Sequence, residues 1–335
     1  MISKKKLLQA VSVSALTAVL AIGSLAINGT SASAQAGINE LTGMPTTAPE
    51  NQRPIAVMID NDKRANPHYG LSEADVVYEM INSTHNNRVT RLMAVYKDYN
   101  TVSRIGNIRS TRPTNIMLAA EYNAVLIHDG GPFYIYPYFD ATGLNHLSGG
   151  FSRIPNGKAR EFTEYCVAGE AATRMAKAGY PAEYTQATSQ HFTFGANSLA
   201  DDAGVAPATN VSVPFPHNST QFVYNAATNS YDYYEFGSPV VDGDDKQQVS
   251  FTNVFLQDCD FTLLDQNGYL VYNCIGTNVG YYLTGGMVIP VTWVKTTFEG
   301  ATKFYTLDGA ELVVNPGKTY IALVPSDAWA KVGIQ

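Results

Sequence analysis

Charged side chains are scarce in this sequence. Only 15% of its 335 residues are charged, whereas 45% are hydrophobic. Soluble domains commonly carry about 25% charged residues. This balance excludes an intrinsically disordered chain, which combines low hydrophobicity with high charge. Bases are scarcer than acids, 22 against 29, and the formal net charge is −7. Such an acidic chain disfavours general binding to nucleic acid or anionic membranes, so we expect no nucleic-acid partner.

Long hydrophobic runs are missing except at the N-terminus. There, Lys4 to Lys6 precede an apolar stretch over residues 7–27, and small residues follow it. This order predicts a secretory signal peptide over residues 1–34, and the alternative is an uncleaved membrane anchor. Cleavage removes three lysines, takes the formal net charge from −7 to −10 and leaves no expected transmembrane span. We therefore expect an extracytoplasmic protein, secreted or associated with the cell wall.

Cysteine is rare, with only Cys166, Cys259 and Cys274 in the whole chain. Export would permit a disulfide. Cys259 and Cys274 flank a turn at residues 265–268, and pairing of the two end residues of this turn would place Cys259 opposite Cys274, within disulfide reach. A two-residue Asn-Gly turn would instead oppose Cys259 to Gly276. The sequence leaves both registers open, and we expect Cys166 to be a buried thiol.

Metal and cofactor signatures are also absent. The six histidines and three cysteines show no zinc spacing. The sequence contains neither a P-loop nor a dinucleotide-binding fingerprint, so we expect no metal site and no cofactor. It also lacks the Gly-x-Ser-x-Gly elbow of serine hydrolases. The sequence alone therefore predicts no catalytic residue and leaves open whether the protein is an enzyme.

The sequence does contain many short apolar runs separated by turn residues. In the first half, buried-strand patterns, a helical pattern over 114–122 and a further strand pattern over 124–127 predict an α/β layer. From residue 221 onward, runs rich in Val, Tyr, Phe and Thr predict strands. We expect an α+β fold with an N-terminal α/β mixed-sheet domain and a β-rich C-terminal domain. The expected parts after the signal peptide are a flexible arm at 35–52, the α/β domain at 53–200, a linker at 201–216 and the β-rich domain at 217–335.

The strongest candidate site lies between a predicted strand and the predicted helix. Arg109, Ser110 and Arg112 immediately precede the helix start, where free backbone N–H groups favour an anion. Guanidinium groups bind phosphate and carboxylate in a bidentate manner. Arg91 opens a neighbouring predicted strand and could converge on the same place. The alternative is a structural ion-pair network with nearby carboxylates such as Asp60.

A second candidate stretch, His128-Asp129-Gly130-Gly131, ends a predicted buried strand. Ligand-contacting groups often gather at strand ends in α/β sheets, and glycines let the backbone approach a ligand. His128 could act as an acid or base, or could be a hydrogen-bonded structural residue. The complete set of candidate ligand-binding residues is Asp60, Arg91, Arg109, Ser110, Arg112, His128, Gly130 and Gly131.

Several motifs resemble the YerB-like family of bacterial lipoproteins, a two-domain family of unknown function. The most distinctive are IGNIRSTRP at 105–113 and HDGG at 128–131, with IPVTW at 289–293 and NPGKT at 315–319 in the second half. The resemblance implies a two-domain architecture and a place in the cell envelope. The lipid-attachment cysteine of that family is missing here, and AREFT at 159–163 replaces an expected Pro-His-Asn-like run.

The arginines are also similar in arrangement to those of the LytR-CpsA-Psr cell-wall ligases, which hold polyprenyl pyrophosphates with arginines. We therefore expect a cell-envelope protein that binds an anionic or glycan ligand, such as a cell-wall glycan or a phosphate-bearing molecule, in its N-terminal domain. One alternative is a cell-wall polymer transferase or hydrolase with an arginine-lined phosphate site. Another is a structural interaction module with a protein partner. Arginines that converge with His128 would favour the first two.

Overall fold

A single mixed sheet combines strands from both halves of the chain in this computed structural model, which describes residues 37–186 and 190–335. Its path runs β12-β22-β21-β18-β25-β4-β5-β3-β7-β8, and β23 pairs with β22. The strand bounds, in that order, are Ala206–Pro207, Met287–Lys295, Gly276–Thr284, Asn253–Cys259, Thr319–Pro325, Val76–Ile81, Thr90–Tyr96, Ile55–Asp60, Val125–His128 and His146–Ser148, with β23 at Lys303–Tyr305.

The middle of this sheet is buried on both faces. Every residue of β3, β4, β5 and β25 is buried, and apolar residues make up most of each strand without a regular alternation with polar ones. β4 and β25 pair in parallel from Val76 opposite Thr319 to Met80 opposite Leu323. The expected α/β and β-rich regions are therefore joined through backbone hydrogen bonds within one sheet.

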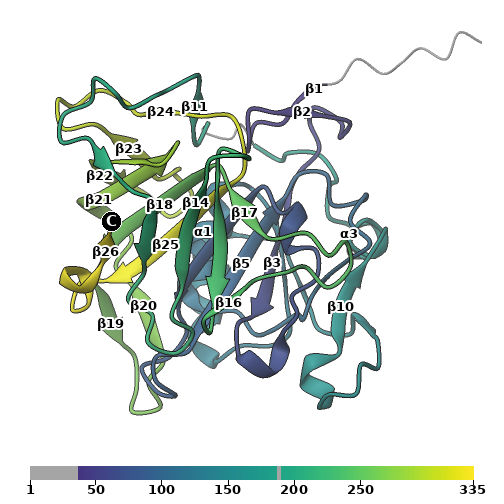
Figure 1. The fold of residues 1–335 in the computed structure, drawn as a ribbon. Helices are drawn as coiled ribbons and strands as arrows, with labels where there is room; N and C mark the ends of the chain where they lie inside the picture. The colour runs from purple at the N-terminus through teal and green to yellow at the C-terminus, as the bar shows by residue number, and fades with distance from the viewer. Residues whose placement is uncertain (1–36, 187–189) are drawn as a thin grey trace, which may run out of the picture. The chain divides into compact units, whose positions relative to one another are not determined.

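A second sheet covers one face of the first. It follows the order β16-β15-β14-β13-β26, and β17 pairs with β15. Phe222 and Tyr233 of this sheet pack their rings against Tyr320 of β25, with centroids 4.6 and 5.6 Å apart. Figure 1 shows β14 and β16 in front of the central sheet. The strand bounds are Ser238–Pro239, Ser230–Glu235, Gln221–Asn225, Asn210–Ser212 and Gly333–Ile334, with β17 at Ser250–Phe251.

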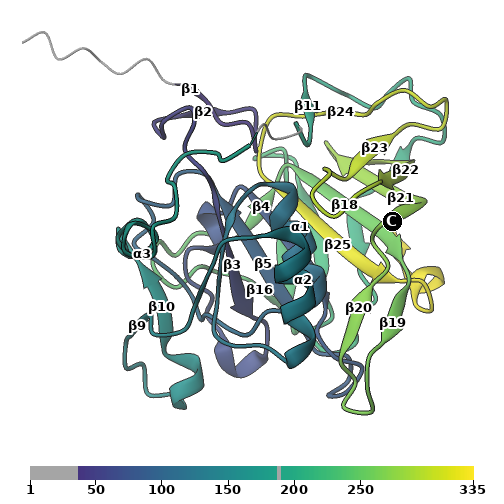
Figure 2. The ribbon, with the colours of Figure 1, turned by 180° about the vertical axis from the view of Figure 1, so that it is seen from behind.

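Two helices cover the opposite face, as Figure 2 shows for α1 (Pro113–Glu121) and α2 (Tyr136–Thr142). Every residue of α1 is buried, because α2, β7 and β20 all pack against this helix. The remaining elements are α3 (Glu170–Ala178), β1 (Gly37–Ile38), β2 (Pro45–Thr46), β6 (Arg104–Gly106), β9 (Ser152–Arg153), β10 (Glu164–Val167), β11 (Thr193–Phe194), β19 (Phe261–Leu263), β20 (Leu270–Tyr272), β24 (Val313–Val314) and the 3-10 helices η1 (Lys63–Ala65), η2 (Leu71–Glu73), η3 (Phe133–Ile135), η4 (Arg160–Phe162) and η5 (Trp329–Lys331).

The mixed sheet agrees with the expected α+β class, but two expected segments are corrected. Residues 37–52 do not form a flexible arm: β1 pairs with β2, Leu41 is buried, and Glu40 accepts a hydrogen bond from the buried Lys97 at 2.7 Å. The expected linker at 201–216 is not a separate connection between domains. It contributes β12, which pairs with β22, and β13, which pairs with β14. The predicted signal peptide lies outside the described residues.

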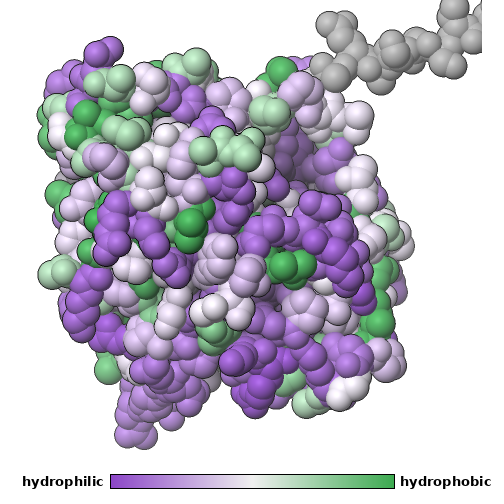
Figure 3. All heavy atoms as spheres, in the orientation of Figure 1, coloured by the Kyte–Doolittle hydropathy of each residue, from purple (hydrophilic) through white to green (hydrophobic). Residues whose placement is uncertain are grey.

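The surface is mainly polar, although the chain carries few charged residues. In Figure 3, hydrophilic residues cover most of the visible face and hydrophobic residues are scattered across it. Within residues 37–186 and 190–335, no helix has both the length and the apolar character needed to cross a membrane.

Candidate anion-binding site

Three arginines come together where β3 ends and α1 begins. Arg91 is the register partner of Asp60 across the antiparallel β3–β5 pair. Residues 107–112 then cross the ends of β3 and β7, held by backbone hydrogen bonds that include Arg109 N to Met58 O at 3.0 Å. Arg112 is the N-cap residue of α1, and its backbone N–H donates to the Asn115 side chain at 3.0 Å. The local fold therefore places all three guanidiniums at one edge of the sheet.

One buried carboxylate lies between two of these guanidiniums. Asp60 is 1% exposed, with its Oδ2 2.9 Å from Arg109 Nε and its Oδ1 3.9 Å from Arg91 Nη2. Arg109 Nη2 also lies 3.2 Å from Glu161, whose side chain is exposed. Arg91 itself is buried and donates from Nη1 to the Ser110 carbonyl at 2.9 Å. Part of the cluster is thus the ion-pair network that the sequence offered as an alternative.

Arg112 has a different environment. It donates from Nη1 to the Thr111 carbonyl at 2.8 Å, and its guanidinium carbon lies 4.9 Å from the centroid of the Tyr269 ring. Among the described residues, no carboxylate forms an ion pair with it. Burial and the charges of Arg91 and Arg109 lower the pKa of Arg112 to about 9. Burial also lowers the pKa of Arg91 to about 10, although Asp60 opposes the shift.

Buried polar atoms without hydrogen-bond partners collect in this cluster. They include the Nε atoms of Arg91, Arg109 and Arg112 and the Oδ2 atom of Asp60. The Arg109–Asp60 contact is therefore an ion pair without hydrogen-bond geometry. A buried donor that lacks an acceptor destabilises a fold by roughly 1–3 kcal/mol. An anion beside the half-buried Arg109 and Arg112 would compensate the excess positive charge of the cluster.

The other predicted site residues shape the cluster without adding a free polar group. Ser110 donates from Oγ to the Asp129 carbonyl at 2.7 Å, so its hydroxyl is already engaged. Gly130 has φ of 73° and accepts a hydrogen bond from the Thr111 N–H at 3.1 Å. At Gly131, an added Cβ would lie 2.7 Å from Ile135 and 3.1 Å from the Thr111 carbonyl. The two glycines thus let this turn pack closely against residues 107–112, which we call the arginine loop.

His128 is engaged elsewhere than with the arginines. Its Nδ1 lies 2.8 Å from the Gly130 carbonyl and its Nε2 lies 3.0 Å from His146 Nδ1. Its ring also packs against Phe139, 5.7 Å between centroids. Burial lowers the pKa of His128 to about 4, which keeps the ring neutral at ordinary pH. These contacts correspond to the structural alternative for this histidine.

Two aromatic residues at the cluster were missed by reasoning from the sequence. Tyr269 reaches Arg112 from the β19–β20 hairpin, and Phe162 lies 5.9 Å from the guanidinium carbon of Arg109. The hairpin is anchored because Tyr272 N–H donates to Thr114 Oγ1 in the first turn of α1 at 2.9 Å. The Asn-Gly turn before Tyr269 indicated a hairpin, but no local pattern indicated that this hairpin would lie against α1.

The same hairpin decides the register that the sequence left open. Phe261 pairs with Tyr272, and Asn273 N–H donates to the Asp260 carbonyl at 2.9 Å, so the next residues outward are Cys259 and Cys274. Both thiols are free in the structure, as is Cys166, and all three are buried. The disulfide between Cys259 and Cys274 therefore stays a prediction, and the observed register is the one that places these two residues opposite each other.

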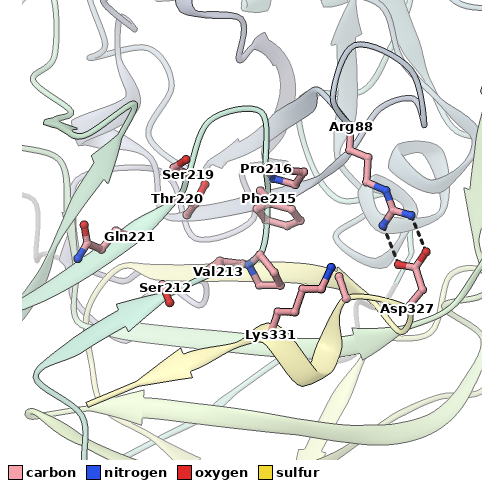
Figure 4. Close-up of a pocket in the computed structure, with 12 residues that line it drawn as sticks. Arg88, Ser212, Val213, Phe215, Pro216, Ser219, Thr220, Gln221, Asp327 and Lys331 are labelled. Atoms are coloured by element: carbon pink, nitrogen blue, oxygen red, sulfur yellow. Dashed lines mark hydrogen bonds and ion pairs between the residues drawn. The ribbon is translucent and has the colours of Figure 1, made fainter.

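A separate groove of about 820 Å³ lies between the β13–β14 connection and the C-terminal segment. Figure 4 shows Phe215 and Pro216 on one side of it and Lys331 on the other. At one end, Arg88 Nη1 donates to Asp327 Oδ1 at 2.7 Å. Unlike Arg112, the arginine of this groove has a carboxylate partner.

Comparison with known proteins places these features in a family. Residues 41–181 match the N-terminal domain, and residues 211–321 the C-terminal domain, of a protein of unknown function (DUF3048). The chain belongs to the DUF3048 family. The YerB-like resemblance seen in the sequence motifs is thereby confirmed. Asp60 and the three arginines lie in the part that matches the N-terminal domain of the family, whereas Tyr269 lies in the part that matches the C-terminal domain.

Two comparisons, both with the YerB protein of Bacillus subtilis, agree with this assignment. The "Putative lipoprotein YerB" of Bacillus subtilis (strain 168) is 24% identical over 304 residues, which is 85% of each chain. The crystal structure of the Bacillus subtilis YerB protein gives a TM-score of 0.75 at 22% identity and covers 89% of this chain and 99% of that one. At this level of identity, the structural similarity shows that the DUF3048 fold is shared.

Proposed function

We propose that this protein is exported, acts at the cell envelope and binds an anionic ligand at the arginine cluster. Export is supported by the predicted signal peptide, and the envelope location by the lipoprotein name of the YerB relative. The observation that carries the ligand proposal is the set of three converging guanidiniums with one buried carboxylate and unpaired Nε donors. A bound anion would neutralise the excess charge, which is the main support for binding at this place.

Binding is favoured over transfer or hydrolysis by the state of the neighbouring polar groups. The Ser110 hydroxyl donates to a backbone carbonyl, and both ring nitrogens of His128 have partners. A nucleophile or general base needs a free position within hydrogen-bond reach of the substrate. The cluster therefore offers positive charge and hydrogen-bond donors, and we propose it as a binding site.

The test is a binding screen of the purified protein against cell-wall glycans, teichoic-type polymers and polyprenyl phosphates. Arg112→Gln removes a guanidinium that has no carboxylate partner, and we expect it to weaken binding of anionic ligands at least tenfold. Arg88→Gln is the matched control, because Arg88 already pairs with Asp327 away from the cluster. Unchanged binding in Arg112→Gln, or equal losses in both variants, would exclude the proposed site.

A further inference from the structure

The arginine cluster continues into a row of aromatic rings. Tyr269 packs over Arg112, and its ring meets Tyr134 edge-on with centroids 6.4 Å apart. Phe133 follows, with its ring centroid 4.0 Å from that of Tyr134. The order from the cluster outward is therefore guanidinium, half-buried Tyr269, half-buried Tyr134 and Phe133. We refer to Tyr269, Tyr134 and Phe133 as the aromatic row.

The outer end of the aromatic row is open to solvent. Phe133 is 69% exposed, and Tyr136, one helical turn further on, is 64% exposed. Large aromatic side chains in neighbouring exposed positions are uncommon in soluble proteins and are enriched where a partner or ligand binds. These two rings stand on η3 and the first turn of α2, so a regular backbone supports them.

The turn that leads into the aromatic row lies against the arginine loop. Gly130, Gly131 and Pro132 directly precede Phe133, and both glycines are exposed. The Thr111 N–H donates to the Gly130 carbonyl at 3.1 Å, which holds this turn against the arginine loop. A ligand with its anionic group at Arg112 can therefore extend along the aromatic row without crossing a side chain of the glycine turn.

The rim of the aromatic row is polar. Tyr134 donates from its hydroxyl to Asp265 Oδ2 at 3.3 Å, and Asp265 also accepts from the Asn267 N–H at 2.9 Å. Covering a carboxylate with a hydrocarbon chain would remove its water without supplying a hydrogen bond. A sugar ring can lie on an aromatic face and donate a hydroxyl hydrogen to the Tyr134 oxygen, because the two Asp265 oxygens already accept four hydrogen bonds from the protein. The rim therefore suits a saccharide better than a lipid tail.

We propose that the ligand of this site is a saccharide that carries a phosphate or carboxylate group, with the anionic group at Arg112 and the sugar along the aromatic row. This inference rests on the proposed anion-binding function and adds the ligand class to it. The two domains of the family would then contribute jointly, the arginines and Phe133 from the first and Tyr269 from the second.

Titration calorimetry with N-acetylglucosamine phosphate, glucuronate, inorganic phosphate and farnesyl phosphate tests this proposal. We expect at least one of the two anionic sugars to bind about tenfold more tightly than inorganic phosphate, which is the scale of one good ring contact. Phe133→Ala should remove this advantage without changing binding of inorganic phosphate, and Arg112→Gln should weaken binding of both. Leu307→Ala is the control, because it also truncates an exposed apolar side chain, 59% exposed, and should change nothing.

The outcomes separate this inference from the function on which it rests. If the protein binds none of the four compounds, the proposed function fails and the inference fails with it. If inorganic phosphate binds as tightly as both anionic sugars, or if Phe133→Ala leaves the advantage of the sugar intact, the saccharide proposal alone is overturned. If farnesyl phosphate binds most tightly and loses this advantage in Phe133→Ala, the aromatic row binds a lipid chain and the saccharide proposal is again overturned.

Discussion

The carboxylates of Glu79 and Glu235 meet inside the molecule and accept hydrogen bonds from the same two amides. Asn61 Nδ2 lies 3.1 Å from Glu79 and 2.6 Å from Glu235, and Asn218 Nδ2 lies 2.6 and 2.9 Å from them. Burial and the charge of Glu235 raise the pKa of Glu79 to about 6. Burial acts on Glu235 too, but the hydrogen bond and charge of His68 outweigh it and leave the pKa of Glu235 lowered. The pair therefore favours one proton on Glu79 under mildly acidic conditions.

This relationship predicts an unusual pH dependence of stability. The folded protein holds the Glu79 proton more tightly than the unfolded chain, whose ordinary value is 4.5. The stabilisation from Glu79 is thus complete below pH 4.5 and is lost as the pH rises through about 6. Glu79→Gln carries no titrating carboxyl at this position. As the pH rises from 4.5 to about 6, its free energy of unfolding should therefore gain about 2 kcal/mol relative to that of the parent protein. Urea denaturation at several pH values measures it, and parallel pH profiles for the two proteins would contradict the assignment.

Arg112 provides a test that separates a functional residue from a structural one. Because Arg112 is held near Arg91 and Arg109 without a carboxylate partner, its charge opposes folding in the absence of an anion. We expect Arg112→Gln to be more stable than the parent protein by about 1 kcal/mol in anion-poor buffer. Added phosphate should raise the melting temperature of the parent protein more than that of the variant. A clear loss of stability in Arg112→Gln would instead assign it to the structural network.

Asp60→Asn should show the opposite behaviour. Asp60 is the buried partner of both Arg91 and Arg109, so neutralising it leaves two guanidiniums without their carboxylate. We expect a loss of about 3 kcal/mol in the free energy of unfolding, as is usual when one partner of a buried ion pair is removed. Added phosphate should recover part of this loss, because it supplies negative charge at the same place. Denaturation with and without phosphate measures both effects, and full stability in Asp60→Asn would refute this role.

Local patterns predicted many of the elements that carry the site. The helical pattern at 114–122 is α1 shifted by one residue, and the strand pattern at 124–127 is β7 shifted by one residue. Arg91 lies beside Arg109 and Arg112 through the β3–β5 pairing, so the sequence could offer this convergence only as one of two alternatives. The helix and strand patterns themselves depend on runs of apolar residues and on the turn residues between them.

The pairing of distant strands could not be predicted in the same way. β25 pairs with β4, more than two hundred residues earlier in the chain, and both strands are buried on both faces. Such runs specify burial but no particular neighbour. The same reason explains why Tyr269 was missed at the arginine cluster and why 201–216 was interpreted as a linker. Segment 201–216 does contain turn residues, but its two short strands pair with β22 and β14, which the local sequence does not identify.

Glu121 forms a second buried ionic centre, and here the charges balance. Its carboxylate lies 2.8 Å from Lys295 Nζ and 2.9 Å from His191 Nε2, and it accepts from the Thr302 N–H at 3.0 Å. Burial would raise the pKa of Glu121, but Lys295 and His191 outweigh it, so stability from this group is lost as the pH falls. Glu121→Gln should destabilise the protein by about 3 kcal/mol. A double variant with Lys295→Met should recover part of this loss, and strict additivity in this double-mutant cycle would contradict coupling.

The two hairpin cysteines give a prediction about the oxidation state of the thiols. Burial raises the pKa of Cys274 to about 12 and that of Cys259 well above its ordinary value, so native thiols should resist alkylation at mildly alkaline pH. When reduced, denatured protein is refolded with a small disulfide such as oxidised glutathione, which takes up the two electrons and two protons, and is then denatured again, it should expose one alkylatable thiol, Cys166. Cys274→Ser should then expose two thiols, because Cys259 has lost its partner. Three alkylated thiols in the oxidised parent protein would show that the favourable register does not lead to a disulfide.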